Sequence, residues 1–243
     1  MRESRVVVIG GGPAGLSAAI VAARLGARVT VLEASARVGG KILATGNGRC
    51  NLSNVTVTPA AYNHPEFVAP VLDAYSAEAV LAFFDDLGLL TYADEQNRIY
   101  PVTNVANSVL DVLRLECEHL GVEQRVGFRA GSVRAREGGG FEIHHGESET
   151  IDADAVVVAT GGADRLLAEA GHASVPHVPV LGPLTTDTAP IRGLSGIRVR
   201  CAATLLAAEA TGADSRDATP LAAERGELLF RDYGVSGIMI FDL

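Results

Sequence analysis

The Gly10–Gly15 segment reads GGGPAG, and its glycine spacing is that of a dinucleotide-binding turn. Here Gly10 would permit a tight turn, Gly12 would let a pyrophosphate approach the backbone, and Gly15 would let a helix pack closely on a strand. All three contacts favour a residue without a Cβ. The N-terminus of the helix that follows would offer free N–H groups and partial positive charge to phosphates. The segment therefore predicts a site for a phosphorylated nucleotide.

The residues on either side of this turn complete a β-α-β unit. The apolar run Arg5–Ile9 predicts a strand buried on both faces, Ala14–Leu25 predicts a helix ended by Gly26, and Arg28–Leu32 predicts a second buried strand. Glu33 then stands where a carboxylate accepts hydrogen bonds from a ribose hydroxyl and repels a 2′-phosphate. Since strand, helix and acid are all in register, we interpret the glycines as a dinucleotide fingerprint rather than a chance cluster.

A second loop with cofactor-binding chemistry is Gly39–Asn54, which reads GGKILATGNGRCNLSN. Its glycines allow close approach to a pyrophosphate or a flat ring, and its asparagines offer amide donors and tolerate left-handed turns. Lys41, which is the sole lysine of the chain, and Arg49 add positive charge. The asparagines are Asn47, Asn51 and Asn54. This combination suits a large, planar, doubly phosphorylated cofactor.

The rest of the first part of the chain predicts further α/β elements. Ser76 begins a helix stopped by Gly88, and Asn104 or Asn107 begins a second helix that Gly121 ends. The alternating residues 122–152 predict a β-hairpin or meander over the sheet. Ala155–Ala159 then predicts a third buried strand, which runs into the turn Thr160-Gly161-Gly162.

From about Pro183 the pattern becomes β-rich. Strands are predicted over Arg198–Leu206 and Glu227–Leu243, with an Ala/Asp/Ser-rich loop at Gly212–Pro220 between them. We therefore divide the chain into a dinucleotide-binding domain, residues 1–183, and the beginning of a second domain, residues 184–243. Because the apolar segment Ile238–Leu243 reads as a strand without a polar tail, we expect a chain truncated at its C-terminus.

Composition excludes several classes of function. The net charge is −9 and no stripe of basic residues interrupts it, which argues against a nucleic-acid partner. No segment has the length and apolarity of a membrane span. Three widely spaced cysteines and six histidines show no metal-binding or disulfide spacing, so we expect no metal and a cytoplasmic location.

Several motifs together resemble a family of bacterial NAD(P)/FAD-dependent oxidoreductases, which includes the aminoacetone oxidase type and the reductases of bile-acid dehydroxylation. The resemblance rests on the Gly39–Asn54 loop, on Asn97–Pro101 (NRIYP), on the ATGG turn that ends at Gly162, on Ala170–His172 and on Gly226–Gly237 (GELLFRDYGVSG). It implies a Rossmann-like α/β domain of the two-dinucleotide-binding flavoprotein type, interrupted by an inserted β-rich substrate domain.

The resemblance also implies FAD as the cofactor and assigns its contacts by position. These contacts would be Gly10, Gly12, Ala14, Gly15, Glu33, Gly40, Lys41, Asn51 and Gly161, with Ala130 on the meander strand beside the adenine. Two departures from the family pattern stand out. Residues 163–165 pass straight into a helix, and the family's last segment, which returns to the FAD domain, is missing. We therefore expect weaker FAD binding than in a full-length relative.

These observations favour an FAD-dependent oxidoreductase of a small-molecule substrate. The flavin would carry hydride between a nicotinamide or substrate donor and an activated C=C bond or oxygen. Two alternatives remain open: an NAD-dependent dehydrogenase, and a non-catalytic FAD-binding fragment. A short-chain dehydrogenase is excluded, since Arg37 stands where the tyrosine paired with Lys41 would be. Oligomeric state and substrate identity are undetermined by the sequence.

No side chain identifies itself as catalytic. Cys50 is either a redox partner of the flavin, if Lys41 and Arg49 lower the pKa of its thiol, or a packing residue, and we favour packing because no second cysteine is spaced to pair with it. Tyr100 and Tyr233 offer hydroxyl groups for proton donation, although buried tyrosines with a satisfied hydroxyl are commoner.

Overall fold

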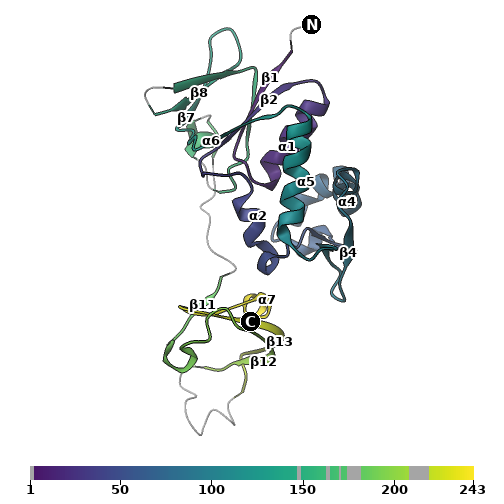
Figure 1. The fold of residues 1–243 in the computed structure, drawn as a ribbon, viewed down its shortest axis with the longest axis vertical. Helices are drawn as coiled ribbons and strands as arrows, with labels where there is room; N and C mark the ends of the chain where they lie inside the picture. Colours follow the sequence, from purple (N-terminus) through teal and green to yellow (C-terminus); the bar gives the residue numbers. More distant parts are fainter. Residues whose placement is uncertain (1–2, 147–148, 163–164, 170, 174–181, 208–218) are drawn as a thin grey trace. The chain divides into compact units, whose positions relative to one another are not determined.

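The computed structural model of the protein (Figure 1) describes residues 3–146, 149–162, 165–169, 171–173, 182–207 and 219–243. The chain divides into two compact units, Met1–His177 and Val178–Leu243. Each unit has its own sheets. The assignment of residues 1–183 to cofactor binding and of residues 184–243 to an inserted substrate domain stays a prediction.

A four-stranded parallel sheet forms the centre of the first unit, in the order β10-β1-β2-β6. Its strands are β1 (Arg5–Ile9), β2 (Arg28–Glu33), β6 (Glu123–Val126) and β10 (Ala155–Val158). In the central register Val8 lies opposite Val31 on one side and Val157 on the other. The predicted α/β class and the first two strands are confirmed.

Two sequence-based interpretations of this sheet are wrong. Residues 123–126 were assigned to the meander, but they pair in parallel with β2 and so belong to the central sheet. The strand at Ala155 was predicted to be buried, yet alternate residues of β10, including Val157, are exposed. The reason is its position, because among the described residues β10 pairs with β1 alone and forms one edge of the sheet.

Helices cover one face of the sheet and a small antiparallel sheet covers the other (Figure 1). Helix α1 (Pro13–Arg24) and helix α5 (Ala106–His119) contact one another, and their apolar residues pack with Val8 and Val31. On the opposite face Val7, Ile9 and Leu32 pack against Ile143 and Ala153 of the antiparallel sheet. Because successive strand residues point to opposite faces, the uniformly apolar β1 supplies both cores.

The antiparallel sheet confirms the predicted meander in its later part. Strands β7 (Ser132–Ala135), β8 (Phe141–His145) and β9 (Glu149–Ala153) lie in sequential order. Gly140, at a φ of 82°, is part of the first turn, and an ideal Cβ there would lie 2.6 Å from the carbonyl oxygen of Ala153. Gly140 is therefore a steric requirement of this hairpin.

The segment between β2 and α5 forms a small subassembly of short helices and a three-stranded antiparallel sheet, β3-β5-β4. Its elements are α2 (Gly40–Ala44), η1 (Thr45–Gly48), β3 (Ser53–Asn54), η2 (Pro59–Ala61), α3 (Pro65–Ala74), α4 (Ala77–Asp86), β4 (Thr91–Ala93) and β5 (Arg98–Pro101). The hydroxyl of Ser76 accepts a 3.3 Å hydrogen bond from the N–H of Ala79, which confirms the predicted cap of α4.

Two features of these helices differ from expectation. Helix α5 has Val105 as its N-cap, with no side-chain cap, instead of Asn104 or Asn107. Helix α3 was not predicted, and it contains Pro70. Within the described part of the chain, no single helix is long and apolar enough to cross a membrane, although α3 and α4, bent by 42° at their junction, pass the length and composition test together.

The second unit holds the antiparallel sheet β11-β14-β13-β12. Its elements are β11 (Leu184–Thr185), η3 (Ala189–Ile191), β12 (Arg198–Leu205), β13 (Ala222–Arg231), β14 (Gly234–Ser236) and α7 (Ile238–Asp242). Helix α6 (Arg165–Glu169) belongs to the first unit. The predicted β12 is confirmed. Residues 208–218, which include most of the predicted loop, lie outside the described residues, as do residues 163–164, Ala170 and His177.

The predicted strand Glu227–Leu243 is wrong as a single element. The chain turns back after β13 to form β14, and Ile238–Asp242 is helical, not extended. Gly237 allows this change of direction at a φ of 115°, where an ideal Cβ would lie 2.5 Å from the carbonyl oxygen of Glu227. The helix buries Met239 and Ile240, which explains why this segment is apolar.

Candidate nucleotide-binding site

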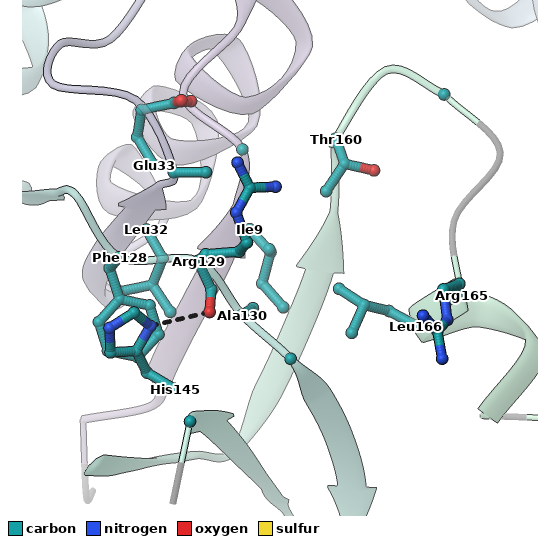
Figure 2. A pocket seen from close by; sticks show the side chains of 15 residues that line it. Ile9, Leu32, Glu33, Phe128, Arg129, Ala130, His145, Thr160, Arg165 and Leu166 are labelled. Carbon is teal, nitrogen blue, oxygen red and sulfur yellow. Dashed lines mark hydrogen bonds between the residues drawn. The ribbon is translucent and has the colours of Figure 1, made fainter. Parts of the chain in front are cut away.

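A cavity of about 730 Å³ lies in the first unit where the parallel strands end (Figure 2). Ile9 ends β1 and Gly10 follows it, Glu33 ends β2, and Thr160 follows β10. The strand order changes direction between β1 and β10, and ligands of open α/β sheets bind at the carboxyl ends of strands beside such a point. The cavity therefore lies where open α/β sheets bind their ligands.

Glycine is required at two positions of the first turn. Gly10 has a φ of 107°, and an ideal Cβ there would lie 2.4 Å from the carbonyl oxygen of Ala159. At Gly15 an ideal Cβ would lie 1.8 Å from the carbonyl oxygen of Gly10. These contacts bring the start of α1 against β1, and β1 against the end of β10. The predicted roles of Gly10 in a tight turn and of Gly15 in helix packing agree with this geometry.

The N-terminus of α1 has no side-chain cap. Gly12 is the N-cap residue, with a φ of −80°, and the first turn carries no acidic residue. An ideal Cβ at Gly12 would meet nothing within 4 Å, and Ala14 is exposed. Neither the backbone conformation nor the packing around residue 12 therefore requires a glycine there. Free N–H groups with open space in front of them form an anion-binding site at a helix N-terminus.

Glu33 is held by the backbone on both carboxylate oxygens. It accepts a hydrogen bond of 2.8 Å from the N–H of Gly11 and one of 2.7 Å from the N–H of Ser35. Partial burial raises the pKa of Glu33, but these N–H groups and the charge of Arg129 outweigh it and hold the pKa below its usual value. A carboxylate has further lone pairs, so Glu33 remains able to accept from a ribose hydroxyl.

The turn between β6 and β7 forms another wall of the cavity, with Arg129 and Ala130 lining it. Ala130 lies in this connection, not on a meander strand as predicted, because β7 begins only at Ser132. The N–H of Phe128 donates to the carbonyl oxygen of Glu33 at 2.9 Å, which places the turn beside the end of β2. Ala130 is thus brought to the same cavity as Gly10 and Glu33.

The Gly39–Asn54 loop is anchored next to the first turn. The N–H of Gly39 donates to the carbonyl oxygen of Gly11 at 2.7 Å, and an ideal Cβ at Gly39 would lie 2.1 Å from Cδ1 of Leu110. Lys41 follows in α2, and its Nζ lies 3.8 Å from the position of an ideal Cβ at Gly161. The two predicted cofactor contacts Lys41 and Gly161 are therefore neighbours.

The remainder of that loop contains several left-handed residues. Asn47 and Cys50 have φ values of 56° and 58°, and an ideal Cβ at Gly46 would lie 2.6 Å from the backbone nitrogen of Asn51. Asn54 has a structural role, since its Oδ1 accepts from the N–H of Thr56 at 2.8 Å. Left-handed conformations in non-glycine residues store strain, and such strain is concentrated at functional sites.

Tyr100 lies beneath this loop and is fully buried. The guanidinium of Arg49 lies 4.9 Å from its ring centroid, and that of Arg98 lies 5.9 Å away. Among the described residues its hydroxyl has no hydrogen-bond partner, which differs from the expectation of a satisfied hydroxyl. Burial raises the pKa of Tyr100 although both arginines act to lower it. The hydroxyl is therefore protonated at neutral pH.

The cavity brings together only part of the predicted set. Gly10, Glu33 and Ala130 line it, and Gly161 stands between two lining residues, Thr160 and Gly162. The other predicted contacts do not line it: Gly12, Ala14, Gly15, Gly40, Lys41 and Asn51. Sequence reasoning missed several lining side chains, namely Phe128, Arg129, His145, Arg165 and Leu166. Phe128 and Arg129 are close to Ala130 in the sequence, but the pairing of β6 with β2 that brings this segment to the cavity is a tertiary feature. His145 comes from β8, and Arg165 and Leu166 come from α6.

Metal and thiol chemistry find no support in the described part of the chain. No group of three or more His, Cys, Asp or Glu side chains there could hold a metal ion. All three cysteines are free thiols, and Cys50 and Cys117 are buried. Burial raises the pKa of the Cys50 thiol, partly opposed by a hydrogen bond with Thr45, and raises that of Cys117 to about 11. Cys50 is thus in a packing environment.

Comparison with known proteins places this geometry in a family. Residues 4–172 match the family described as "HI0933-like protein Rossmann domain". The chain is 34% identical to the 3-dehydro-bile acid delta(4,6)-reductase of Clostridium scindens, over 99% of this chain and 59% of that protein. It is 33% identical to the ribosomal RNA dihydrouridine synthase of Haemophilus influenzae, over 49% of this chain and 30% of that protein.

Among solved structures, THI4 of Thermovibrio ammonificans is similar with a TM-score of 0.48 and 19% identity, over 74% of this chain and 66% of that chain. Of the two curated relatives, the match with this chain spans about three-fifths of the length of the Clostridium protein and less than a third of the length of the Haemophilus protein.

Proposed function

Because the chain belongs to the HI0933-like Rossmann-domain family, we propose that it is an FAD-dependent oxidoreductase whose first unit binds the FAD. One observation carries this proposal above the others. Gly10, Glu33 and Ala130, three positions expected to contact a dinucleotide, line one cavity at the point where the parallel sheet changes direction.

The residues present fit the parts of FAD. The uncapped N-terminus of α1, with Gly12 and Ala14, would hold the pyrophosphate, since an approaching phosphate meets N–H groups and no Cβ at Gly12. Glu33 would accept a hydrogen bond from the adenosine ribose, and Ala130 would lie beside the adenine. The flavin half would be held by Gly40, Lys41, Asn51 and Gly161. Lys41 and Gly161, which lie close together, support this last assignment.

The chemistry would belong to the cofactor, since a bound flavin accepts and delivers hydride. The residues of this chain would bind and orient the cofactor and offset its negative charge. The ammonium of Lys41 would offset negative charge, and Glu33 would fix the ribose while its own charge is stabilised by the Gly11 and Ser35 N–H groups. No side chain in the cavity is proposed as a general acid or base.

We propose that the substrate is a small molecule with an activated C=C bond, reduced with a nicotinamide cofactor as donor. The name of the Clostridium relative, a delta(4,6)-reductase, supports this substrate class. The ribosomal RNA named for the Haemophilus relative is a poorer candidate, because a chain with a net charge of −9 repels a polyanion. Free thiols at all three cysteines support the cytoplasmic location that we propose.

The proposal is tested by mixing the purified protein with excess FAD, removing free FAD by gel filtration and recording the visible spectrum. A retained flavin spectrum is expected, followed by oxidation of NADH or NADPH that depends on an added enone. Retained flavin without any turnover, with either donor or with oxygen, would favour a non-catalytic FAD-binding fragment. A colourless protein that binds NADH would instead favour an NAD-dependent dehydrogenase and would overturn the proposal.

A further inference from the structure

The turn that carries Arg129 into the cavity is fixed by hydrogen bonds on both sides. The N–H of Phe128 donates to the carbonyl oxygen of Glu33 at 2.9 Å, and the N–H of Gly131 donates to the carbonyl oxygen of His144 at 2.7 Å. The Nδ1–H of His145 donates to the carbonyl oxygen of Arg129 itself at 2.9 Å. The backbone of Arg129 is therefore tied both to the parallel sheet and to the antiparallel one.

His145 is in turn held by an aromatic contact. Its ring lies 4.6 Å from the ring of Phe128, centroid to centroid, with the planes 32° apart. The guanidinium of Arg125 lies 5.3 Å from the centroid of Phe128 and pairs with Glu149. Because a carbonyl oxygen only accepts, the hydrogen bond to Arg129 requires a proton on Nδ1 of His145. Several side chains thus hold one carbonyl group in place.

The side chain of Arg129 extends into the cavity. In Figure 2 its guanidinium lies between Glu33, at the end of β2, and Thr160, beyond the end of β10. Its charge acts on the carboxylate of Glu33. Arg129 is exposed and lines the open cavity, so its guanidinium is accessible to a ligand there. A planar cation beside a ribose-binding acid suits a purine nucleoside, on which a guanidinium stacks.

We infer that Arg129 is a specificity-determining residue for the adenosine half of the dinucleotide, and that His145 is the positioning residue that presents it. The inference rests on the proposed function, because it names side chains that would recognise one part of FAD. It goes beyond the glycine and glutamate contacts of the fingerprint, since neither Arg129 nor His145 belongs to that motif. A flat guanidinium would cover the purine, whereas a lysine ammonium would supply charge without a stacking plane.

The test uses ADP as the probe, because ADP contains the adenosine half and the pyrophosphate but no flavin. Affinities for ADP and for FAD are measured by isothermal titration on the whole chain. The variants are Arg129→Ala, Arg129→Lys, His145→Phe and the double variant Arg129→Ala/His145→Phe. Arg134→Ala is the matched control, because it removes the same charge from the neighbouring strand β7 without touching the cavity lining. Thermal unfolding shows that each variant is folded.

We expect Arg129→Ala to weaken ADP and FAD binding alike, by about 10-fold, and Arg129→Lys to recover less than half of that loss in free energy. His145→Phe keeps an aromatic ring on Phe128 but loses the donor, and we expect a loss of about 3-fold. In the Arg129→Ala background the same histidine change should cost nothing further, because a positioning residue acts through the residue it positions. A purely structural role for His145 would instead add its effect in both backgrounds.

Two results would overturn the inference. If Arg129→Ala and Arg134→Ala bind ADP as tightly as the unmodified chain, Arg129 has no role in recognition. If the effects of the Arg129 and His145 changes add, His145 does not act through Arg129. Failure of the proposed function looks different, because the unmodified chain would then bind neither FAD nor ADP.

Discussion

The carboxylate of Glu33 accepts a 2.8 Å hydrogen bond from the backbone N–H of Gly11, which ties the end of β2 to the turn after β1. This contact joins the two elements of the fingerprint before any nucleotide is present. Its partner contact, from the N–H of Ser35, uses the other carboxylate oxygen. Glu33 therefore stabilises the fold of the site in addition to its proposed contact with a ribose.

Replacing Glu33 by Gln should make stability less dependent on pH. The folded-state pKa of Glu33 is lowered, so its contribution is present above the unfolded pKa of about 4.3 and is lost as pH falls through the lower folded value. Urea unfolding at pH 7 should give a loss of about 1–2 kcal/mol for Glu33→Gln, because the amide group cannot accept on both sides. At pH 3 the two proteins should differ less. An equal difference at both pH values would contradict this account.

Two glycines of the same turn should respond to alanine in opposite ways. Gly10→Ala should lower the free energy of unfolding by about 1–3 kcal/mol from backbone strain alone, with the contact to Ala159 adding to it. Gly12→Ala should leave stability nearly unchanged, because its φ of −80° suits alanine and nothing lies within 4 Å. It should nevertheless weaken FAD binding, since the new methyl group occupies the approach of the pyrophosphate. Thermal melts and FAD titrations of both variants separate the two effects.

Elements of the fold could be predicted where the local sequence pattern matches the environment that the tertiary structure gives them. Arg5–Ile9 is apolar throughout because β1 is buried on both faces, and Gly26 ends α1 at a φ of 85°. The strand at residues 123–126 escaped detection because it is short and its partner β2 lies far back in the sequence. The helix at Ile238–Asp242 was read as a strand, since a short apolar run fits both structures and only Gly237 separates them.

The residues of the candidate site also differ in whether local sequence or tertiary pairing places them. Gly10 and Glu33 could be placed from the motif, because the spacing of a β-α-β turn fixes their geometry. Arg129 and His145 could not, since their position depends on where β6 pairs and on how β8 returns to the turn at residues 128–131. Lys41 and Gly161 lie far apart in the chain, and only the completed sheet brings them together.

Lys41 is the one lysine of the chain, so its removal is a clean change. Lys41→Met keeps the length and apolar part of the side chain but removes the ammonium group. We expect FAD affinity to fall about 5- to 10-fold, as for the loss of one charge-assisted contact, while stability changes little because Lys41 is exposed. Lys41→Arg is the control and should retain most of the affinity. Equal affinity for Lys41→Met would remove Lys41 from the proposed contacts.

The three cysteines should differ in reactivity toward a disulfide reagent such as DTNB. Cys50 and Cys117 are buried, and burial raises the pKa of each thiol, so neither provides thiolate at neutral pH. Cys201 is only half-buried, and it should supply the single fast-reacting thiol of the native protein. All three should react after unfolding in urea. Cys201→Ser should abolish the fast phase, whereas a fast phase that persists in this variant and disappears in Cys50→Ser would return Cys50 to consideration as a redox partner of the flavin.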